Sequence, residues 1–421
     1  MLEVAKTRTL PTSSSSRPPA RRILILAVIP CAACLAYWPL RLAWADQLSR
    51  ATDVETVARA VRLSPGDADF RLKLAAAQQS AGADPTAALQ AAAALDPGNA
   101  DAWTRLGVAA EMRGDLRTAE SRLLQAAHAS RQFAPRWALA NYYFRRGDRA
   151  HFWPWATESL LMGYGDLHPI FRLCWNMSQN AGLILERAIP ARREVLDAYV
   201  WFLMQEGRLA ASEPAATRLA ALATIEDRSI LVPWCNRLID AGAVAPTLEV
   251  WNTLCARHVL PYAPVDPDRA PLTDGGFAVA SVGGGFAWRL APAPGVTLGR
   301  NRSPLYLWVA FSGDQPETCT PLIQFVPVTP GARYGLRFEY HTSDLPPASG
   351  LRWSVFDART GIDLATASPW LSNPEWKPAE LHFTAPAAGL VRLTLTCQRL
   401  PGATRIQGSV GLRQLALERR P

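Results

Sequence analysis

The sequence predicts a multidomain fold: an N-terminal transmembrane helix, an all-α solenoid and a C-terminal all-β sandwich of the jelly-roll type. Three observations support this prediction. Residues 23–40 carry no charge, the Ala- and Leu-rich residues 46–259 repeat a short pattern, and residues 272–421 alternate apolar and polar side chains between turns. A chain of 421 residues is long enough for two or three domains with separate cores.

The first 42 residues predict a disordered cytoplasmic tail and a membrane anchor. The tail, residues 1–22, is rich in Ser, Pro and Arg. The anchor, residues 23–42, begins with an apolar run just long enough to cross a bilayer. Because basic residues cluster before the span, the positive-inside rule predicts a single-pass bacterial inner-membrane protein whose bulk lies in the periplasm. A cleaved signal peptide is the alternative, since Ala43 and Ala45 fit a cleavage site.

Composition argues against nucleic-acid binding, and it does not decide whether one pair of cysteines forms a disulfide. The net charge is +8, but basic residues crowd the tail and elsewhere lie among acidic residues, without a basic and aromatic stripe. Of the seven cysteines, only Cys319 and Cys397 lie in the last third of the chain. An oxidising compartment permits a bridge between them, although the sequence does not give their separation. The spacing of the other cysteines suits no metal site.

A pattern with a period close to 34 residues recurs in the first half. Residues 63–70 recur as residues 95–103, and Trp103 recurs as Trp137, 34 residues later. The pattern resembles the tetratricopeptide repeat, in which an aromatic residue, Leu and Gly open the first helix and small residues admit the second. The residues that match are Trp103, Leu106, Gly107, Ala119 and Ala126, and Trp137 opens the next repeat.

The resemblance implies a solenoid of helix pairs from about residue 46 to residue 259. Further helix pairs flank Gly207 and Gly242, where the repeat pattern itself weakens. Stacked helix pairs form a concave surface, which such proteins use to hold a protein partner. The aromatic-rich residues 141–155 belong either to that surface or to the core between repeats.

The second half predicts a linker and a β domain. Residues 260–271 contain four prolines and cannot form a helix. From residue 272 on, alternating runs recur about every ten residues, which is typical of a sandwich or jelly roll. Five glycines in residues 274–290 suggest a phosphate loop, but the run that follows them is strand-like and no GxxxxGKS motif is present.

Several motifs in this half resemble the carbohydrate-binding modules attached to bacterial xylanases and cellulases. They are Asp274-Gly275-Gly276-Phe277, Trp288, Gln324, the run from Val328 to Tyr334, and Trp376. The resemblance implies a galactose-binding-like jelly roll over residues 272–417. In that family an Asp on the last strand helps to hold a structural calcium ion. Because Arg413 and Gln414 stand there instead, the calcium is doubtful, and we expect no cofactor and no other metal.

The whole layout also resembles membrane-anchored tetratricopeptide proteins that accompany bacterial exopolysaccharide synthesis and export. In those proteins a helical repeat region precedes this kind of sandwich. The resemblance implies that this protein is a non-catalytic scaffold, with a solenoid that binds a protein and a sandwich that binds a polysaccharide.

Outward-facing residues on three predicted strands suggest the glycan site. Leu305, Leu307 and Val309 share one side of a strand, which turns Tyr306 and Trp308 outward. Large exposed aromatic residues on a strand mark binding surfaces. If residues 305–313, 334–341 and 391–398 share a sheet, its outer face carries Tyr306, Trp308, Arg337, Glu339, His341 and Arg392.

No catalytic motif has adequate spacing, so the sequence predicts no enzyme. The six histidines are isolated, and residues 407–411 lack the order of a nucleophile elbow. The alternative is a glycoside hydrolase or transferase with its active site on the sandwich, which needs two carboxyl groups facing each other across a cleft. Glu339, Asp357, Asp363 and Glu380 fit that role by residue type alone.

Overall fold

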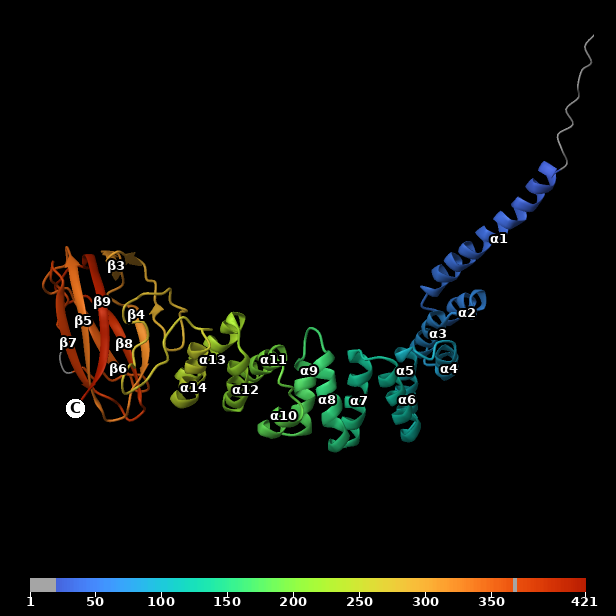
Figure 1. The fold of residues 1–421 in the computed structure, drawn as a ribbon, viewed down its shortest axis with the longest axis horizontal. Coiled ribbons are helices and arrows are strands. Elements are labelled where there is room, and N and C mark those ends of the chain that lie inside the picture. Colours follow the sequence, from blue (N-terminus) through green and yellow to red (C-terminus); the bar gives the residue numbers. More distant parts are fainter. Residues whose placement is uncertain (1–19, 366–368) are drawn as a thin grey trace, which may run out of the picture. The chain divides into compact units, whose positions relative to one another are not determined.

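The computed structural model describes residues 20–365 and 369–421, with side chains from residue 35 on. Within these residues a series of helices is followed by a series of strands (Figure 1). The chain divides into two compact units, Met1–Met162 and Gly163–Pro421. The described residues of the first unit form helices, whereas the second unit combines helices with the β-sandwich.

Helix α1 (Ala20–Ser49) includes the predicted anchor, residues 23–42. Most of the predicted tail, residues 1–22, lies outside the described residues. Within the part of the chain whose side chains are described, no helix is long and apolar enough to cross a membrane. The described end of the predicted anchor exposes Leu35, Trp38 and Leu40. The transmembrane anchor therefore stays a prediction.

The first unit continues with antiparallel helix pairs. A recurring signal starts them: a side-chain oxygen of Asp53, Asp67, Asn99 or Asp115 accepts a hydrogen bond from a backbone N–H of the first turn. The helices are α2 (Val54–Leu63), α3 (Ala68–Ser80), α4 (Thr86–Leu95), α5 (Ala100–Met112), α6 (Leu116–Ala129), α7 (Phe133–Arg146) and α8 (Arg149–Met162).

The residues predicted to pack the repeat lie largely at the contact between α5 and α6. A Cβ atom on Gly107 would lie 2.6 Å from Leu123 Cγ, so only glycine permits this approach. Trp103 is half-buried and donates from its indole N–H to the Pro97 carbonyl oxygen. Trp137 is also half-buried and stacks on Phe133. The other three residues, Leu106, Ala119 and Ala126, are buried.

The helices of the second unit keep a repeat of similar length. Arg193 donates to Asp227 across 34 residues, whereas Arg218 and Arg237 each donate to a carbonyl oxygen 33 residues earlier. The predicted pairs around Gly207 and Gly242 are present. The helices are α9 (His168–Met177), α10 (Ala181–Arg187), α11 (Arg193–Gln205), α12 (Leu209–Leu222), the 3-10 helix η1 (Ile225–Asp227), α13 (Arg228–Asp240) and α14 (Val244–Ala256).

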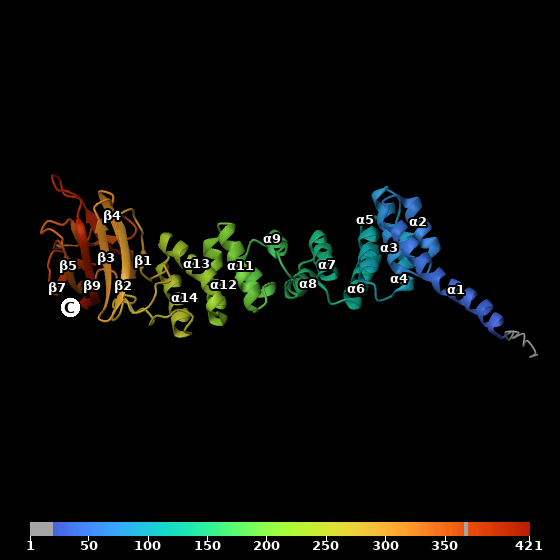
Figure 2. The ribbon, with the colours of Figure 1, turned by 90° about the horizontal axis from the view of Figure 1, so that it is seen from above.

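Two antiparallel sheets form the sandwich, in the orders β1-β4-β8-β6 and β2-β3-β9-β5-β7. Figures 1 and 2 both show β5 beside β9. Alternate residues of β5 point into the core between the sheets, where Tyr334 and Phe338 are fully buried. The strands are β1 (Arg289–Leu290), β2 (Val296–Arg302), β3 (Leu305–Ser312), β4 (Thr318–Pro327), β5 (Arg333–Ser343), β6 (Leu351–Asp357), β7 (Lys377–Thr384), β8 (Leu390–Gln398) and β9 (Gln407–Arg420).

The glycine-rich residues 283–285 pack the sandwich against α13 and α14. Gly285 donates its N–H to Asn236 Oδ1 at 2.7 Å. A Cβ atom on Gly285 would lie 2.2 Å from the Trp251 ring, and its φ is +57°. Trp251 also stacks on Tyr262 and meets Phe286 edge to face. The glycines therefore serve close packing between the helices and the sandwich.

Cys319 and Cys397 lie opposite each other in β4 and β8. Both are buried free thiols. Their mutual hydrogen bond and their burial raise the pKa of the Cys397 thiol, so this thiol ionises reluctantly. The pairing of β4 with β8 thus places the two cysteines next to each other, which the sequence alone did not show.

We expect the two thiols to form a disulfide when the protein is exported, because their strands already place them side by side. Peptide mass spectrometry of protein alkylated while denatured and unreduced should find a peptide joining Cys319 to Cys397. Cys174, Cys235 and Cys255 should be alkylated in the same sample and serve as internal controls. Alkylation of all five would contradict the bridge.

Gly107→Ala should lower the free energy of unfolding by about 1–3 kcal/mol, because the new Cβ atom overlaps Leu123. Thermal unfolding followed by far-UV circular dichroism measures the change. The matched control is Gly66→Ala, since an added Cβ there meets no atom within 4 Å. Equal melting temperatures for the two variants would show that α5 and α6 do not pack as described.

Candidate functional site

An aromatic cluster lies on the outer face of the five-stranded sheet. The Tyr306 ring centroid lies 5.6 Å from that of His341 and 5.5 Å from that of Trp376. The His341 and Trp376 centroids are 4.4 Å apart. The structure thus brings together two of the predicted site residues and adds Trp376, which directly precedes β7.

Glycines on neighbouring strands leave space for the rings of Trp308 and His341 to pack flat against the sheet. Gly299 of β2 is opposite Trp308, and a Cβ atom there would lie 2.4 Å from the indole. Gly411 of β9 is opposite both Trp308 and His341, and its Cβ would lie 2.3 Å from His341 Nε2. As a result, Trp308 and His341 are half-buried against their own sheet.

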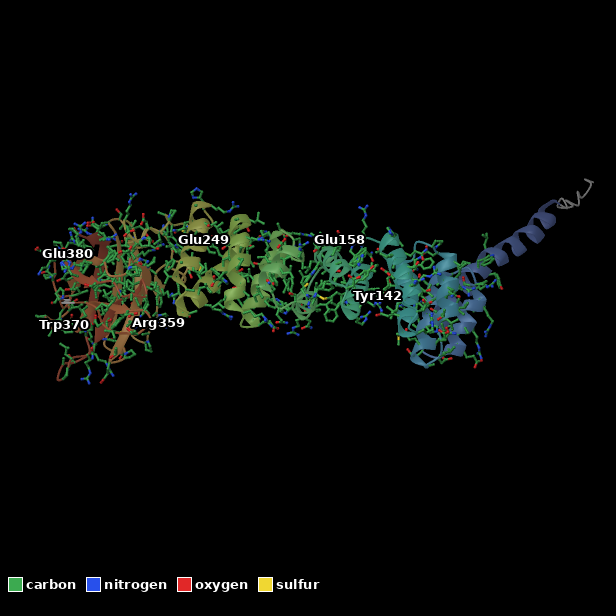
Figure 3. All side chains as sticks on the ribbon, turned by 90° about the horizontal axis from the view of Figure 1, so that it is seen from below. Tyr142, Glu158, Glu249, Arg359, Trp370 and Glu380 are labelled. Atoms are coloured by element: carbon green, nitrogen blue, oxygen red, sulfur yellow. The ribbon has the colours of Figure 1, made fainter. Side chains whose placement is uncertain are left out.

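The charged residues of this face are paired within the protein. Arg413 Nε donates to Glu339 Oε2 at 2.7 Å, and its guanidinium lies 4.0 Å above the Trp376 ring. Arg337 pairs with Glu418, and Glu380 pairs with Arg420. Nitrogen atoms gather beside Glu380 in Figure 3.

An open hollow of about 560 Å³ lies between the β5, β7 and β9 residues of this face. Arg337, Glu339, Glu380 and Gln414 are among the residues that line it. Arg413 and Gln414 occupy the place where the resemblance led us to expect a calcium ligand, and Arg413 is committed to Glu339. In the described residues, no group of three or more His, Cys, Asp or Glu side chains is arranged to hold a metal ion.

Arg392 does not join this face, which corrects the predicted sheet. It lies on β8, and β8 belongs to the four-stranded sheet together with β4 and β6. The alternation of a single strand predicts which side chains point outward, but not which sheet the strand enters. Arg392 pairs in register with Phe325 on one side and with Phe356 on the other. Its guanidinium lies 5.1 Å from the centroid of the Phe356 ring.

Two further arginines stack on aromatic rings on the outer face of the four-stranded sheet. The Arg289 guanidinium lies 4.4 Å from the Phe325 ring, and the Arg352 guanidinium lies 5.4 Å from the Trp370 ring. Trp370 is labelled in Figure 3. We call this surface the arginine–aromatic face; it comprises Arg289, Phe325, Arg352, Phe356, Trp370 and Arg392.

Polar groups at the arginine–aromatic face are incompletely satisfied. Among the described residues, Arg392 has no carboxylate partner, and neither its Nε nor Ser354 Oγ has a hydrogen-bond partner. Ser354 and Thr394 lie next to each other at the centre of the sheet and are only 1% and 2% exposed. Small buried hydroxyl residues are thus flanked by larger arginine and aromatic side chains.

A second candidate site lies in the helical first unit. A groove of about 460 Å³ runs between α5 and α7, and its lining includes Met112, Trp137 and Asn141. Met112 is 80% exposed, and Arg145 forms a two-pronged ion pair with Glu111 on the groove wall. The groove combines apolar contact surface with polar groups at its edge.

Sequence reasoning missed Phe325, Phe356 and Trp370 as surface residues. The alternation of β4 and β6 carried a signal, since Phe325 and Phe356 lie on the sides opposite the buried Val326 and Val355. Trp370 gave no such signal, because it lies outside the named strands. Trp376 and Arg413 were visible only as motif positions.

Comparisons with known proteins support the helical repeats most directly. A tetratricopeptide repeat family matches residues 88–121, which span α5. No curated protein matches the chain. The described part of the chain therefore has helical repeats like those of tetratricopeptide proteins, followed by an all-β sandwich.

Similar solved structures include both helical and β proteins. YrrB, described as a TPR protein with an unusual peptide-binding site, is 13% identical over 49% of this chain and 94% of its own, with a TM-score of 0.25. TmCBM61, solved with beta-1,4-galactotriose, is 16% identical over 36% and 100%, with a TM-score of 0.26. The CBM22-1 xylan-binding domain of Paenibacillus barcinonensis Xyn10C is 9% identical over 34% and 91%, with a TM-score of 0.25. These scores are too low to carry a functional argument.

The pKa of His341 should lie below its ordinary value of 6.5, first because burial disfavours the charged ring and second because Arg413 is nearby. The unfolded chain then binds more protons than the folded one just below pH 6.5, so the free energy of unfolding should fall as the pH drops through this range. An NMR titration of the His341 ring measures the pKa. Arg413→Gln should raise it, and a wild-type pKa above 6.5 would overturn the assignment.

Proposed function

We propose that this protein is a non-catalytic, membrane-anchored scaffold of the bacterial periplasm that acts in exopolysaccharide or envelope polysaccharide assembly or export. Its helical repeats bind a protein partner, and its sandwich binds a polysaccharide. The support consists of the tetratricopeptide repeats, the sandwich and the two surfaces described above.

One observation carries the glycan proposal: Arg392 lies between two phenylalanines on an outer face and has no carboxylate partner among the described residues. A guanidinium stacked on a ring keeps its in-plane N–H groups free for a carboxylate. Ser354 and Thr394 beside it are small and buried, so the arginine and the aromatic rings form the exposed part of this face. The arginine–aromatic face therefore suits a polysaccharide that carries acidic groups.

The face predicted from the sequence is a weaker candidate. Tyr306, Trp308 and His341 offer ring surface, but the charged groups around them are already paired within the protein. A ligand would have to replace those pairs, whereas Arg392 offers an unpaired cation. We therefore place the main glycan contact on the four-stranded sheet and keep the aromatic cluster as the rival site.

The groove between α5 and α7 supports the protein-binding part of the proposal. An extended or helical segment of a partner would bury Met112 and Trp137 and find Asn141 as a hydrogen-bonding group. Alanine in place of Trp137 should weaken such a complex without unfolding the unit, because the ring is only half-buried.

The glycan proposal is tested by affinity electrophoresis of the full chain in mild detergent. The gels contain alginate, an acidic polysaccharide, or alginate whose carboxylates have been reduced to alcohols. We expect retardation by the acidic polymer only. Arg392→Gln should weaken binding roughly tenfold, which corresponds to the loss of one charge-assisted hydrogen bond.

The controls separate the two faces of the sandwich. Arg359→Gln removes an exposed arginine on the turn after β6 and should leave binding unchanged (Figure 3). Trp308→Ala should also leave it unchanged. Loss of binding in Trp308→Ala with full binding in Arg392→Gln would move the site to the five-stranded sheet. No retardation of the wild type would leave the sandwich as a protein-docking module.

The anchor and the export of the chain are tested by a fusion. A reporter enzyme that works only outside the cytoplasm should be active when joined after Pro421, because a cluster of basic residues precedes the proposed span and only Arg41 lies close to its other end. Activity of a cytoplasm-dependent reporter at the same position would reverse the topology. It would also remove the oxidising environment that the Cys319–Cys397 bridge requires.

The alternative function is a carbohydrate-active enzyme with its site on the sandwich. Glu339 and Glu380 both line the hollow of the five-stranded sheet, but each is ion-paired to an arginine. Both carboxylates are therefore occupied by arginines, whereas a glycosidase needs a carboxyl group that is free to act on the substrate as the acid. Release of reducing ends from envelope polysaccharide, abolished by Glu339→Gln, would establish the enzyme in place of the scaffold.

A further inference from the structure

Strand β2 is an open edge of the five-stranded sheet. It pairs with β3 along its whole length, from Val296 opposite Phe311 to Arg302 opposite Leu305. Among the described residues, no strand pairs with the other side of β2 beyond Val296. Its outward-directed amides and carbonyls are therefore available to an additional strand.

A largely apolar pocket of about 260 Å³ lies along this edge. One wall is formed by Leu298, Gly299 and Arg300 of β2, and the other by Val279, Ala280 and Ser281 of the preceding loop. The pocket also includes the buried side chains of Phe277, Trp288 and Leu307 and the exposed Leu290. Its size suits one apolar side chain.

The loop wall is held in place by hydrogen bonds. The Asp274 carboxylate accepts from the N–H groups of Ala278 and Val279 at 2.8 and 3.2 Å. The Trp288 indole donates to the Asp274 carbonyl oxygen at 3.0 Å, and Val282 donates to the Tyr262 hydroxyl at 3.0 Å. The pocket is thus preformed, as ligand pockets usually are.

Because side chains alternate along a strand, a strand added at the open edge of β2 would direct every second side chain toward this pocket. In the cross-strand pairs, Leu298 and Arg300 share the side of the core residues Val309 and Leu307, whereas Gly299 lies on the outer side below Trp308. A strand added beside β2 would turn one set of side chains toward the pocket and the other toward the Trp308 ring.

The positive charge at the edge of β2 determines which strands can pair with it. Arg300 and Arg302 are exposed, and neither forms a salt bridge with another described residue. Arg300 Nη1 donates to the Phe277 carbonyl oxygen at 3.3 Å and lies near the Asp274 carboxylate of the pocket lining, which leaves Arg302 as the freer of the two charges. A charged residue that points inward at a sheet edge opposes indiscriminate pairing. A strand with an acidic residue beside Arg300 removes this obstacle, whereas a basic or neutral strand does not.

We propose that β2 is a strand-addition site for an extended, acidic peptide of a partner protein, which inserts one apolar side chain into the pocket. Backbone hydrogen bonds to β2 hold the peptide, and the pocket and the two arginines select its sequence. The site is independent of the proposed glycan face, which lies on the other sheet.

A phage-displayed library of random nonapeptides, selected on the full chain in detergent, tests the proposal. Enriched peptides should share one large apolar residue flanked by Asp or Glu. Ala280→Trp fills the pocket and should weaken their binding about tenfold, the value of one buried apolar side chain. Ala278→Trp, on the same loop but outside the pocket lining, is the matched control and should bind normally.

Two further measurements complete the test. Arg302→Glu should weaken the same peptides without touching the pocket, and bound peptide should slow hydrogen exchange of β2 amides. Enriched peptides that are insensitive to both Ala280→Trp and Arg302→Glu, or no enrichment at all, would overturn the proposal. So would a native mass spectrum showing a small apolar molecule that is lost in Ala280→Trp, or a dimer of the chain that dissociates in Arg302→Glu.

Discussion

The arrangement of the second unit depends on the contact between Trp251 and the glycine-rich loop. Trp251 is fully buried, with Tyr262 stacked on it, Phe286 at its edge and the Gly285 backbone against its ring. Asn236 completes the contact by accepting hydrogen bonds from Gly285 and Arg289. Any side chain at position 285 would collide with the indole, so the junction requires glycine.

This contact links the last helices to the sandwich surface. Arg289, held by Asn236 of α13, also stacks on Phe325 of the arginine–aromatic face. The residues expected to form a plain linker, 260–271, are packed as well, since Val265 exchanges two hydrogen bonds with Asn252 of α14. The helical and β parts of this unit are therefore joined by specific packing.

Local patterns predicted the elements well. The helix pairs followed from Gly107, Gly207 and Gly242, because glycine marks either a close helix approach or a left-handed turn. The outward direction of Tyr306 and His341 followed from strand alternation. These features depend on residues within a few positions of each other.

Contacts between residues that lie far apart in the sequence could not be predicted from local patterns. Arg392 was assigned to the wrong sheet, because strand order in a sandwich is decided by the pairing of distant segments. The contact of Gly285 with Asn236 joins residues 49 positions apart and has no local signal. Ion pairs such as Arg413 with Glu339, 74 positions apart, likewise decide which polar groups of a face are already occupied.

Hydrogen exchange of the full chain, measured with and without an acidic polysaccharide, tests the central claim most directly. Polysaccharide bound at the arginine–aromatic face should slow exchange in β4, β6 and β8 and leave β3 and β9 unchanged. Protection confined to β3, β5 and β9 would contradict this account and return the glycan site to the aromatic cluster of Tyr306, His341 and Trp376.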